Sequence, residues 1–296
     1  MKWGSQTKPY ILALGAIFFW STAATAFKLA LKHMDFIQLL FISSLTATVF
    51  LFIVLIAQNK INLLRKLSFK DYLKSAPVGL LNPFLYYLVL LKAYSILPAQ
   101  IAQPLNYTWP IMLVLLSVPF LKQKLYFKSI IAIIISFSGV LIISSQGQNI
   151  LEFKISNPFG VLLATGSSLA WAMFWILNVK NKKDEVLKLF LNFSFALIFI
   201  SIVFFVFSKP EKALHINGII PAVYIGLFEM GIAFILWLKA LKLSPSNEKI
   251  SNLVFISPFL ALIFIHIILG EQIYMSTWAG LILIIAGIYI QQKRKK

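Results

Sequence analysis

The sequence predicts an all-α integral membrane protein with ten transmembrane helices, arranged as two inverted repeats of five helices each. Three observations predict this fold class: long stretches without charged residues, basic residues gathered in every second connection, and a second half that aligns with the first. The composition agrees, because 60% of the 296 residues are hydrophobic and 12% are charged, whereas about 25% are charged in typical soluble domains. The sequence therefore argues against a soluble two-domain protein.

Ten stretches are long enough to cross a membrane. A helix rises about 1.5 Å per residue and needs about 20 apolar residues to span about 30 Å of hydrocarbon. One stretch, 213–238, is interrupted only by Glu229, and the other nine contain no Asp, Glu, Lys or Arg. In chain order, the nine are 9–27, 36–59, 75–91, 93–121, 129–151, 155–179, 189–208, 250–270 and 272–292. Together the ten leave no room for a soluble domain.

The basic residues predict the orientation. The chain carries 27 Lys and Arg against 9 Asp and Glu, a net charge of +18. If the N-terminus is cytoplasmic, 21 basic residues fall in cytoplasmic segments, and the remaining six are Lys28, Lys32, Lys92, Lys154, Lys209 and Lys212. Such a bias orients membrane proteins, so we predict that both termini are cytoplasmic. A nucleic-acid partner is not expected, because the basic residues flank apolar stretches instead of covering one soluble face.

The second half of the chain repeats the first. Shifts of 147 to 151 residues lay the matched residues on one another in the same order. The matched pairs include Trp20 with Trp171, Gly79 with Gly226, and Pro110 with Pro258. We therefore predict two repeats, 1–150 and 151–296. Since five is odd, the second repeat enters the bilayer from the opposite side, an arrangement typical of secondary transporters whose site lies near the bilayer midplane.

Enzymatic chemistry finds little support in the sequence. There is no cysteine, no Gly-x-Gly, no Walker loop and no His-Glu-x-x-His, and no Asp lies inside a predicted span. The three histidines, His33, His215 and His266, are too dispersed to indicate a metal site. We predict neither enzymatic activity, nor a metal, nor a cofactor.

Glu229 is the one carboxylate deep inside a predicted span. It lies twelve residues from either end of a helix over 217–241, where an ionised group costs at least about 2.5 to 3.5 kcal/mol. It should therefore face a cavity or a partner instead of lipid. One interpretation is a proton-coupling or amine-binding carboxylate, and the other is a structural acid hydrogen-bonded between helices. Its repeat counterpart is Asn82, which is polar but does not titrate.

Aromatic residues gather in the same spans. Their rings suit a pocket for flat apolar groups, although inside helices such rings also serve as packing or interfacial belts. Asn106, beside a predicted kink at Pro104 and Pro110, is suited to bind either a substrate carboxylate or a freed backbone carbonyl. His266 is either a relay to Glu229 or a solvated residue near a span end. The candidate substrate-binding residues are Trp20, Asn82, Tyr86, Asn106, Tyr107, Trp109, Trp171, Trp175, Glu229 and Trp237, and the aromatic set also includes Tyr87 and Phe234.

Several short motifs resemble one transporter family. Phe19-Trp20-Ser21-Thr22, Trp171, Gly270-Glu271 and Gly287 resemble the EamA branch of the drug/metabolite transporter superfamily, and the resemblance covers about residues 9 to 292. Within that branch, two further motifs are similar to bacterial exporters of aromatic amino acids. They are Asn106-Tyr107-Thr108-Trp109-Pro110 and Ala233-Phe234-Ile235-Leu236-Trp237.

The resemblance implies a secondary transporter of the bacterial inner membrane that exports amino acids by alternating access, with aromatic amino acids as the first choice. The residues alone indicate a membrane-embedded permeation device with an aromatic, sparsely charged interior. The alternatives are an exporter of other metabolites or of cationic drugs, an uptake permease, and a scaffold that transports nothing. The expected partners are a small-molecule substrate and the lipid bilayer, with protons as the candidate coupling ion, and the protein is a monomer or a homodimer.

Overall fold

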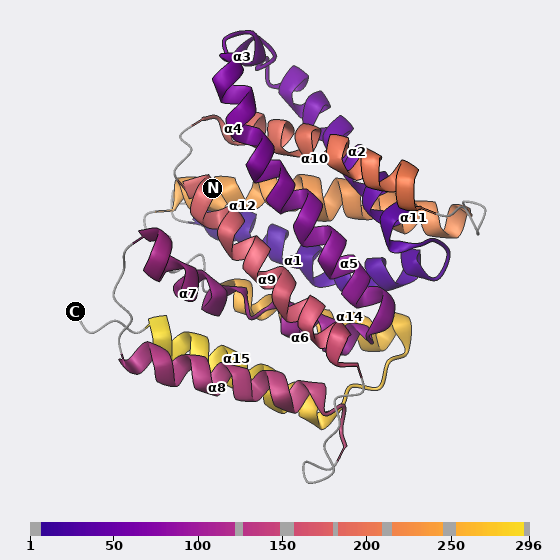
Figure 1. Ribbon diagram of the computed structural model, residues 1–296, viewed down its shortest axis with the longest axis vertical. Helices are drawn as coiled ribbons and strands as arrows, with labels where there is room; N and C mark the ends of the chain where they lie inside the picture. The colour runs from indigo at the N-terminus through magenta and orange to yellow at the C-terminus, as the bar shows by residue number, and fades with distance from the viewer. Residues whose placement is uncertain are drawn as a thin grey trace.

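The computed structural model describes residues 7–121, 127–148, 157–179, 183–208, 215–244 and 253–292. Within these ranges every regular element is a helix, and the helices pack side by side in one bundle (Figure 1). The all-helical fold class is therefore confirmed. The predicted boundary between the two repeats, at residues 150 and 151, lies outside the described residues.

The helices before residue 150 include one long helical rod whose middle is π-helical instead of α-helical. This rod runs through α4, the π-helical segment η1 and α5, and spans Phe69–Ile96. The elements are α1 (Thr7–Leu31), α2 (Phe36–Ala57), α3 (Asn62–Arg65), α4 (Phe69–Gly79), η1 (Leu80–Leu85), α5 (Tyr86–Ile96), α6 (Ala99–Asn106), α7 (Trp109–Leu121) and α8 (Phe127–Ser144).

The helices after residue 150 contain a similar interrupted rod, in which the π-helical segment η3 joins α11 to α12. Short 3₁₀ and π-helical segments, η4 and η5, flank α14. The elements are α9 (Pro158–Val179), α10 (Glu185–Phe207), α11 (Ile216–Tyr224), η3 (Ile225–Ile232), α12 (Ala233–Leu243), η4 (Val254–Ile256), α14 (Ser257–Phe264), η5 (Ile265–Leu269) and α15 (Met275–Gln292).

The lengths of the helices agree with a chain that crosses a membrane several times. In the described part of the chain, 7 helices are long and apolar enough to cross, and three shorter apolar helices cover Ile130–Ser144, Val254–Leu269 and Met275–Ile290. All of them fall on stretches that the sequence predicts as spans. Since the three are shorter than a full crossing requires, the count of ten stays a prediction.

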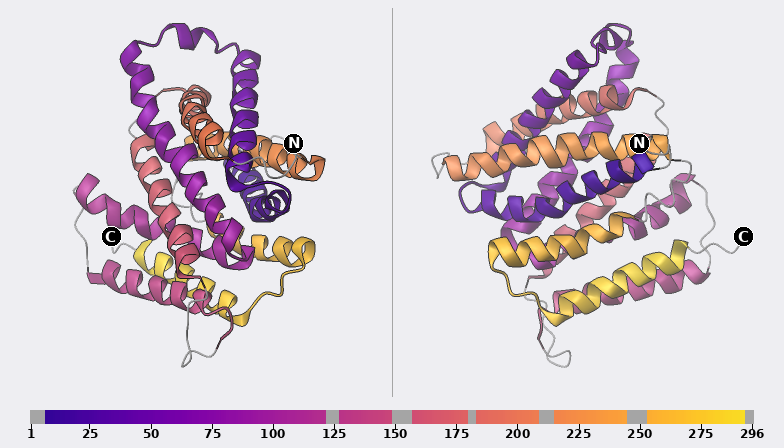
Figure 2. Two further views of the ribbon diagram at one scale, coloured as in Figure 1. Left: turned by 45° about the vertical axis from the view of Figure 1, so that its right-hand side comes forward. Right: turned by 180° about the vertical axis from the view of Figure 1, so that it is seen from behind.

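Helices from the two parts of the chain pack against each other. Helix α1 packs against α12 and α14, while α9 packs against α5, α6 and α7. Helices α2 and α10 lie side by side, and α8 and α15 form a separate pair along one edge of the bundle (Figure 1). In the right-hand view of Figure 2 the start of α1 and the end of α15 lie toward the same end of the bundle.

Small residues allow α8 and α15 to approach closely. A Cβ atom added at Gly139 would lie 2.5 Å from the carbonyl oxygen of Gly280, and one added at Gly280 would lie 2.5 Å from the carbonyl oxygen of Gly139. Helices in lipid associate through such close backbone contact, because burial of apolar side chains supplies no driving force between them there. The two glycines therefore allow the backbones of α8 and α15 to come into direct contact.

Candidate functional site

The predicted kink near Pro104 and Pro110 is a true break between two helices. Helix α6 ends at Asn106 and α7 begins at Trp109. Pro110 has no backbone N–H, and it fits the first turn of α7 because the N–H groups of a first turn have no acceptors within the helix. The hydroxyl of Thr108 donates to the carbonyl of Leu105 at 2.8 Å, which satisfies one carbonyl at the end of α6. The break brings Asn106, Tyr107 and Trp109 to one region of the bundle interior.

Glu229 lies in the π-helical segment η3. A wide turn of this kind is common at functional sites, and Gly226 in the same segment lets it approach α2, because an added Cβ would meet the Ser43 carbonyl oxygen at 2.4 Å. Only 5% of Glu229 is exposed. Its Oε1 accepts a hydrogen bond of 2.5 Å from the hydroxyl of Tyr87 on α5, whereas Oε2 is buried without a hydrogen-bond partner among the described residues.

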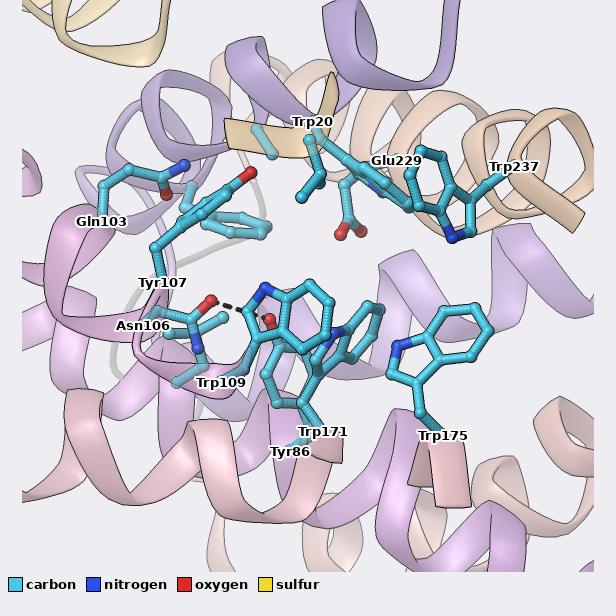
Figure 3. Close-up of a pocket in the computed structure, with 14 residues that line it drawn as sticks. Trp20, Tyr86, Gln103, Asn106, Tyr107, Trp109, Trp171, Trp175, Glu229 and Trp237 are labelled. Carbon is cyan, nitrogen blue, oxygen red and sulfur yellow. Dashed lines mark hydrogen bonds between the residues drawn. The ribbon is translucent and has the colours of Figure 1, made fainter. Parts of the chain in front are cut away.

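The broken helix and the η3 segment both border one cavity in the bundle (Figure 3). Its walls come from α1, α5, α6, α7, α9, η3, α12 and η4. Nine of the ten predicted site residues line it: Trp20, Tyr86, Asn106, Tyr107, Trp109, Trp171, Trp175, Glu229 and Trp237. The structure thus brings together residues that are up to 217 positions apart in the chain.

Asn82 is the predicted residue that lies elsewhere. It is buried in η1 with extended backbone (φ −150°, ψ 125°), and it is not among the residues that line the cavity. Neither atom of its side-chain amide has a hydrogen-bond partner among the described residues. Asn82 and Glu229 therefore both lie in π-helical segments, but only Glu229 reaches the cavity.

Aromatic rings form most of the cavity wall. Trp20 and Trp237 lie with ring centroids 5.2 Å apart, and Tyr86 and Trp171 lie 4.7 Å apart. Phe234 does not line the cavity but packs edge-to-face against Trp20 and Trp171, with ring centroids 6.3 Å and 5.5 Å apart. Rings packed at these distances hold one another in place, so the wall offers preformed flat surfaces to an apolar group.

A chain of hydrogen bonds ties the broken helix to α9. The Asn106 amide accepts from the Tyr86 hydroxyl at 3.1 Å and donates to the Ser167 hydroxyl at 2.8 Å. At the next residue of α9, the hydroxyls of Thr108 and Ser168 lie 3.1 Å apart. Asn106 therefore bonds to side chains of α5 and α9, and among the described residues it makes no bond to a freed backbone carbonyl, which is one of the two alternatives from the sequence.

Gln103 is a cavity residue that the sequence did not single out. Its Oε1 accepts a hydrogen bond of 2.5 Å from the hydroxyl of Tyr94, and the residue lines the cavity. The available signal was its spacing, because Gln103 lies three residues before Asn106 and shares one face of α6 with it. The remaining lining residues are apolar: Ala23, Phe27, Leu90 and Val254.

The described cavity wall contains one ionisable acid and no basic side chain, since neither Lys, Arg nor His is among its residues. Ion pairs lie outside the cavity wall, for example between Lys60 and Asp184, Lys183 and Asp71, and Lys242 and Glu185. No group of three or more His, Asp or Glu suited to a metal ion occurs in the described parts of the chain. The site can therefore offer flat apolar surfaces, hydrogen bonds and one carboxylate.

A second polar cluster lies where the start of α6 meets the connection between η5 and α15. Both oxygens of the Glu271 carboxylate accept backbone N–H groups at the start of α6, from Ala99 at 3.0 Å and Gln100 at 3.1 Å. His266 belongs to this cluster, because its Nδ1 lies 3.0 Å from the Glu271 carbonyl oxygen in an exposed position. His266 does not line the cavity, so the structure does not support a relay from it to Glu229.

Comparison with known proteins relates the whole chain to transporters. The model of the EamA-like transporter family matches residues 7–145 and again residues 158–291. The chain is 27% identical to the uncharacterized transporter YvbV of Bacillus subtilis (strain 168), over 100% of this chain and 95% of that protein. It is 26% identical to an uncharacterized transporter of Clostridium kluyveri, over 98% of this chain and 94% of the relative.

A solved crystal structure has the same fold. Its chain is 17% identical in sequence and superimposes with a TM-score of 0.65, covering 97% of both chains. A similarity at this level of identity concerns the fold alone.

Proposed function

The chain belongs to the EamA-like transporter family, and from this premise we propose that it is a secondary transporter that moves small metabolites through the aromatic cavity by alternating access. The observation that carries the proposal is the cavity itself, which is built from helices of both parts of the chain and contains one buried carboxylate. A cavity between two sets of helices is what alternating access requires, because each side must open in turn around one site.

We propose further that ten helices form two inverted repeats. The family model matches the chain twice, once on each side of residue 150. The packing also agrees, because α1 contacts the helix α12 of the other part while α9 contacts α5, and each interrupted rod contains one π-helical segment, η1 or η3. Exchange of conformation between two such halves would open the cavity to opposite sides of the membrane.

For the substrate, we propose amino acids, with aromatic amino acids as the first choice and export as the direction. The likeness of the Asn106–Pro110 and Ala233–Trp237 motifs to exporters of aromatic amino acids supports this choice. Rings such as Trp20 and Trp171 suit a flat side chain by stacking. The excess of basic residues on one side of the predicted spans supports a bacterial inner membrane protein with both termini in the cytoplasm.

Glu229 is the candidate for proton coupling. Its carboxylate is buried, lines the cavity and has one oxygen without a hydrogen-bond partner among the described residues. A carboxylate in such a place can take up a proton on one side of the membrane and release it on the other. Because Glu229 lines the cavity in which a substrate would bind, proton binding at its carboxylate would be coupled to substrate binding.

Reconstitution tests the proposal directly. Vesicles containing the full chain and loaded with unlabelled amino acid should accumulate the same labelled amino acid by counterflow, most strongly with phenylalanine, tyrosine or tryptophan. If no amino acid shows counterflow, the amino-acid proposal is wrong. Glu229→Gln should abolish the dependence of exchange on a pH gradient, while Glu185→Gln, at the surface pair with Lys242, should retain it.

A further inference from the structure

One of the two carboxylate oxygens of Glu229, which lines the cavity, has no hydrogen-bond partner among the described residues. The Tyr87 hydroxyl holds Oε1 at 2.5 Å and so fixes the direction of the carboxylate. Oε2 has no partner among the described residues, although the side chain is 95% buried. A buried polar atom without a partner is costly. A ligand that donates a hydrogen bond to Oε2 would remove this cost.

The surroundings of the carboxylate favour a positive charge. In Figure 3 the Glu229 carboxylate points into the space between Trp20 and Trp237 on one side and Trp109 and Trp171 on the other. The faces of indole and phenol rings attract cations, and this attraction grows when water is excluded. The rings and the carboxylate therefore both favour a cation, and both would contact an ammonium group in the cavity.

No opposing charge is present in the described wall. Neither Lys, Arg nor His lines the cavity, so a ligand carboxylate would meet only neutral donors such as the amide of Gln103 and the indole N–H groups. A buried charge without an opposite charge is unfavourable. A ligand with an ammonium group and no carboxylate would instead neutralise Glu229 and leave no charge unpaired.

We propose that Glu229 binds the protonated amine of the substrate and that the cavity ranks aromatic ligands by net charge, with the amine before the amino acid and the acid last. This inference rests on the proposed transport function and names the substrate class of the same cavity. The proposed amino acids carry the required ammonium group, and the corresponding aromatic amines carry it without the carboxylate. Tyr87 is a positioning residue, because it holds the carboxylate without being one of the residues that line the cavity.

Three indole compounds that differ in their charged group test the ranking. They are tryptamine, tryptophan and indole-3-propionate, each titrated calorimetrically into the purified full chain in detergent and then offered to reconstituted vesicles. We expect tryptamine to bind about tenfold or more tightly than indole-3-propionate, with tryptophan between them, because a hydrogen bond to a charged partner contributes that much. Glu229→Gln should remove most of this preference, and Glu185→Gln should leave it unchanged.

The outcomes separate the inference from the proposed function. If no compound binds or is transported, the proposed function fails. If the compounds bind but tryptophan or the acid binds as tightly as the amine to the natural chain, the charge ranking is wrong, and this result needs no variant. If the ranking persists in Glu229→Gln, the assignment to Glu229 is wrong. Tyr87→Phe keeps the carboxylate and should weaken amine binding while preserving the order, and a loss of the order would also contradict the proposal.

Discussion

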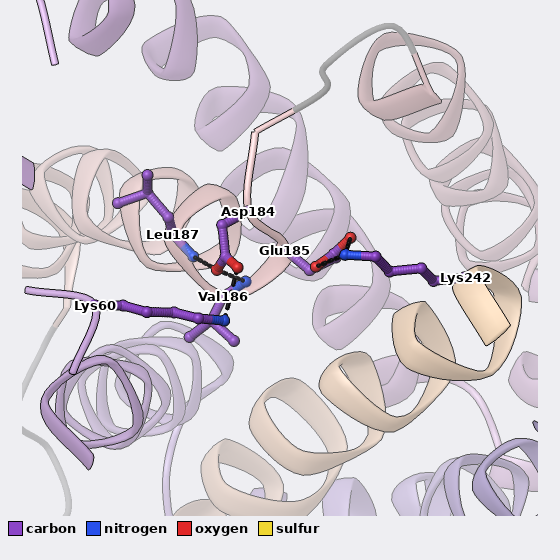
Figure 4. Close-up of polar contacts among 6 residues, drawn as sticks. All are labelled: Lys60, Asp184, Glu185, Val186, Leu187 and Lys242. Carbon is purple, nitrogen blue, oxygen red and sulfur yellow. Dashed lines mark hydrogen bonds and ion pairs between the residues drawn. The ribbon is translucent and has the colours of Figure 1, made fainter. Parts of the chain in front are cut away.

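Asp35 and Asp184 cap the two helices of an antiparallel pair, and each also binds the far end of the partner helix. Asp35 accepts the backbone N–H groups of Ile37 and Gln38 at the start of α2, and it accepts the hydroxyl of Ser208 at the end of α10. Asp184 accepts hydrogen bonds from the backbone N–H groups of Val186 and Leu187 at the start of α10 (Figure 4). It also forms an ion pair with Lys60, beyond the end of α2, with 2.7 Å between the charged atoms. The two acids therefore fix α2 and α10 in register at both ends.

Replacing Asp184 by Ala should lower the free energy of unfolding by about 1 kcal/mol at neutral pH, because the first turn of α10 loses its cap. Partial burial of Asp184 opposes ionisation, but the hydrogen bonds from Lys60 and from the backbone of Leu187 outweigh it and lower the pKa of Asp184. The stabilisation is therefore present above the ordinary Asp pKa of about 3.9 and lost as the pH falls through the lower value of the folded protein.

Thermal unfolding in detergent at several pH values measures this effect. The difference between the natural chain and Asp184→Ala should shrink below about pH 4. Lys242→Ala, which breaks a more exposed ion pair with Glu185, serves as the control and should change the free energy by less than about 1 kcal/mol. Equal destabilisation by Asp184→Ala at pH 3 and pH 7 would contradict the linkage.

The same substitution at two glycines should have opposite effects. Gly139→Ala places a Cβ 2.5 Å from the Gly280 carbonyl oxygen, so α8 and α15 must separate, at a cost of about 1 to 3 kcal/mol. Gly166→Ala on α9 meets no atom within 4 Å and should stabilise the protein by about 0.4 to 1 kcal/mol, since alanine loses less chain entropy on folding. Unfolding temperatures of the two variants compare them directly, and a shift of both in one direction would show that the close contact does not matter.

Asn106 and Tyr86 should be energetically coupled. Asn106→Ala leaves the buried Tyr86 hydroxyl without its acceptor, which costs about 1 to 3 kcal/mol. In a chain that already carries Tyr86→Phe, no hydroxyl remains to be left unpaired, so the same substitution should cost less. A double-mutant cycle on unfolding free energies should therefore give a coupling of about 0.5 kcal/mol or more. Additive effects of the two substitutions would exclude a role for this hydrogen bond in holding the broken helix.

The Glu271 contact should keep one end of the cavity closed. Glu271→Ala removes the acceptor of two backbone N–H groups at the start of α6, where an anion also interacts favourably with the helix dipole. The natural chain contains no cysteine, so Ala23→Cys on the cavity wall gives a single thiol. We expect a membrane-impermeant thiol reagent to label it several-fold faster from that side in the Glu271→Ala background.

The matched control for this experiment is Glu185→Gln, at the opposite end of the bundle, which should leave the labelling rate unchanged. Unaltered labelling in the Glu271→Ala background would mean that the contact does not control access. Circular dichroism of both variants establishes that the helices remain folded, so that faster labelling reports opening and not unfolding.

Much of the site followed from the sequence, and its omissions have a clear cause. The unusual depth of one carboxylate pointed to Glu229, and the repeat pointed to Trp20 and Trp171, and all three line the cavity. The repeat also selected Asn82, which lies outside the cavity. Two residues at equivalent depths in their spans do not both have to point into the cavity. Gln103 was missed although it lies three residues before Asn106, because that spacing places both side chains on one helix face without showing that the face borders a cavity.

The sequence by itself determined the all-helical fold class and the transporter family. The thickness of a bilayer sets how many uncharged residues each crossing needs, so the hydrophobic stretches alone predict the helices, and the motifs along them identify the family. Only the tertiary structure decided that Tyr87 binds Glu229 and that Asn106 binds Tyr86 and Ser167. The positions of Tyr87 and Glu229 differ by 142 residues, and the rotation of each helix depends on packing against its neighbours, which no local pattern in the chain records.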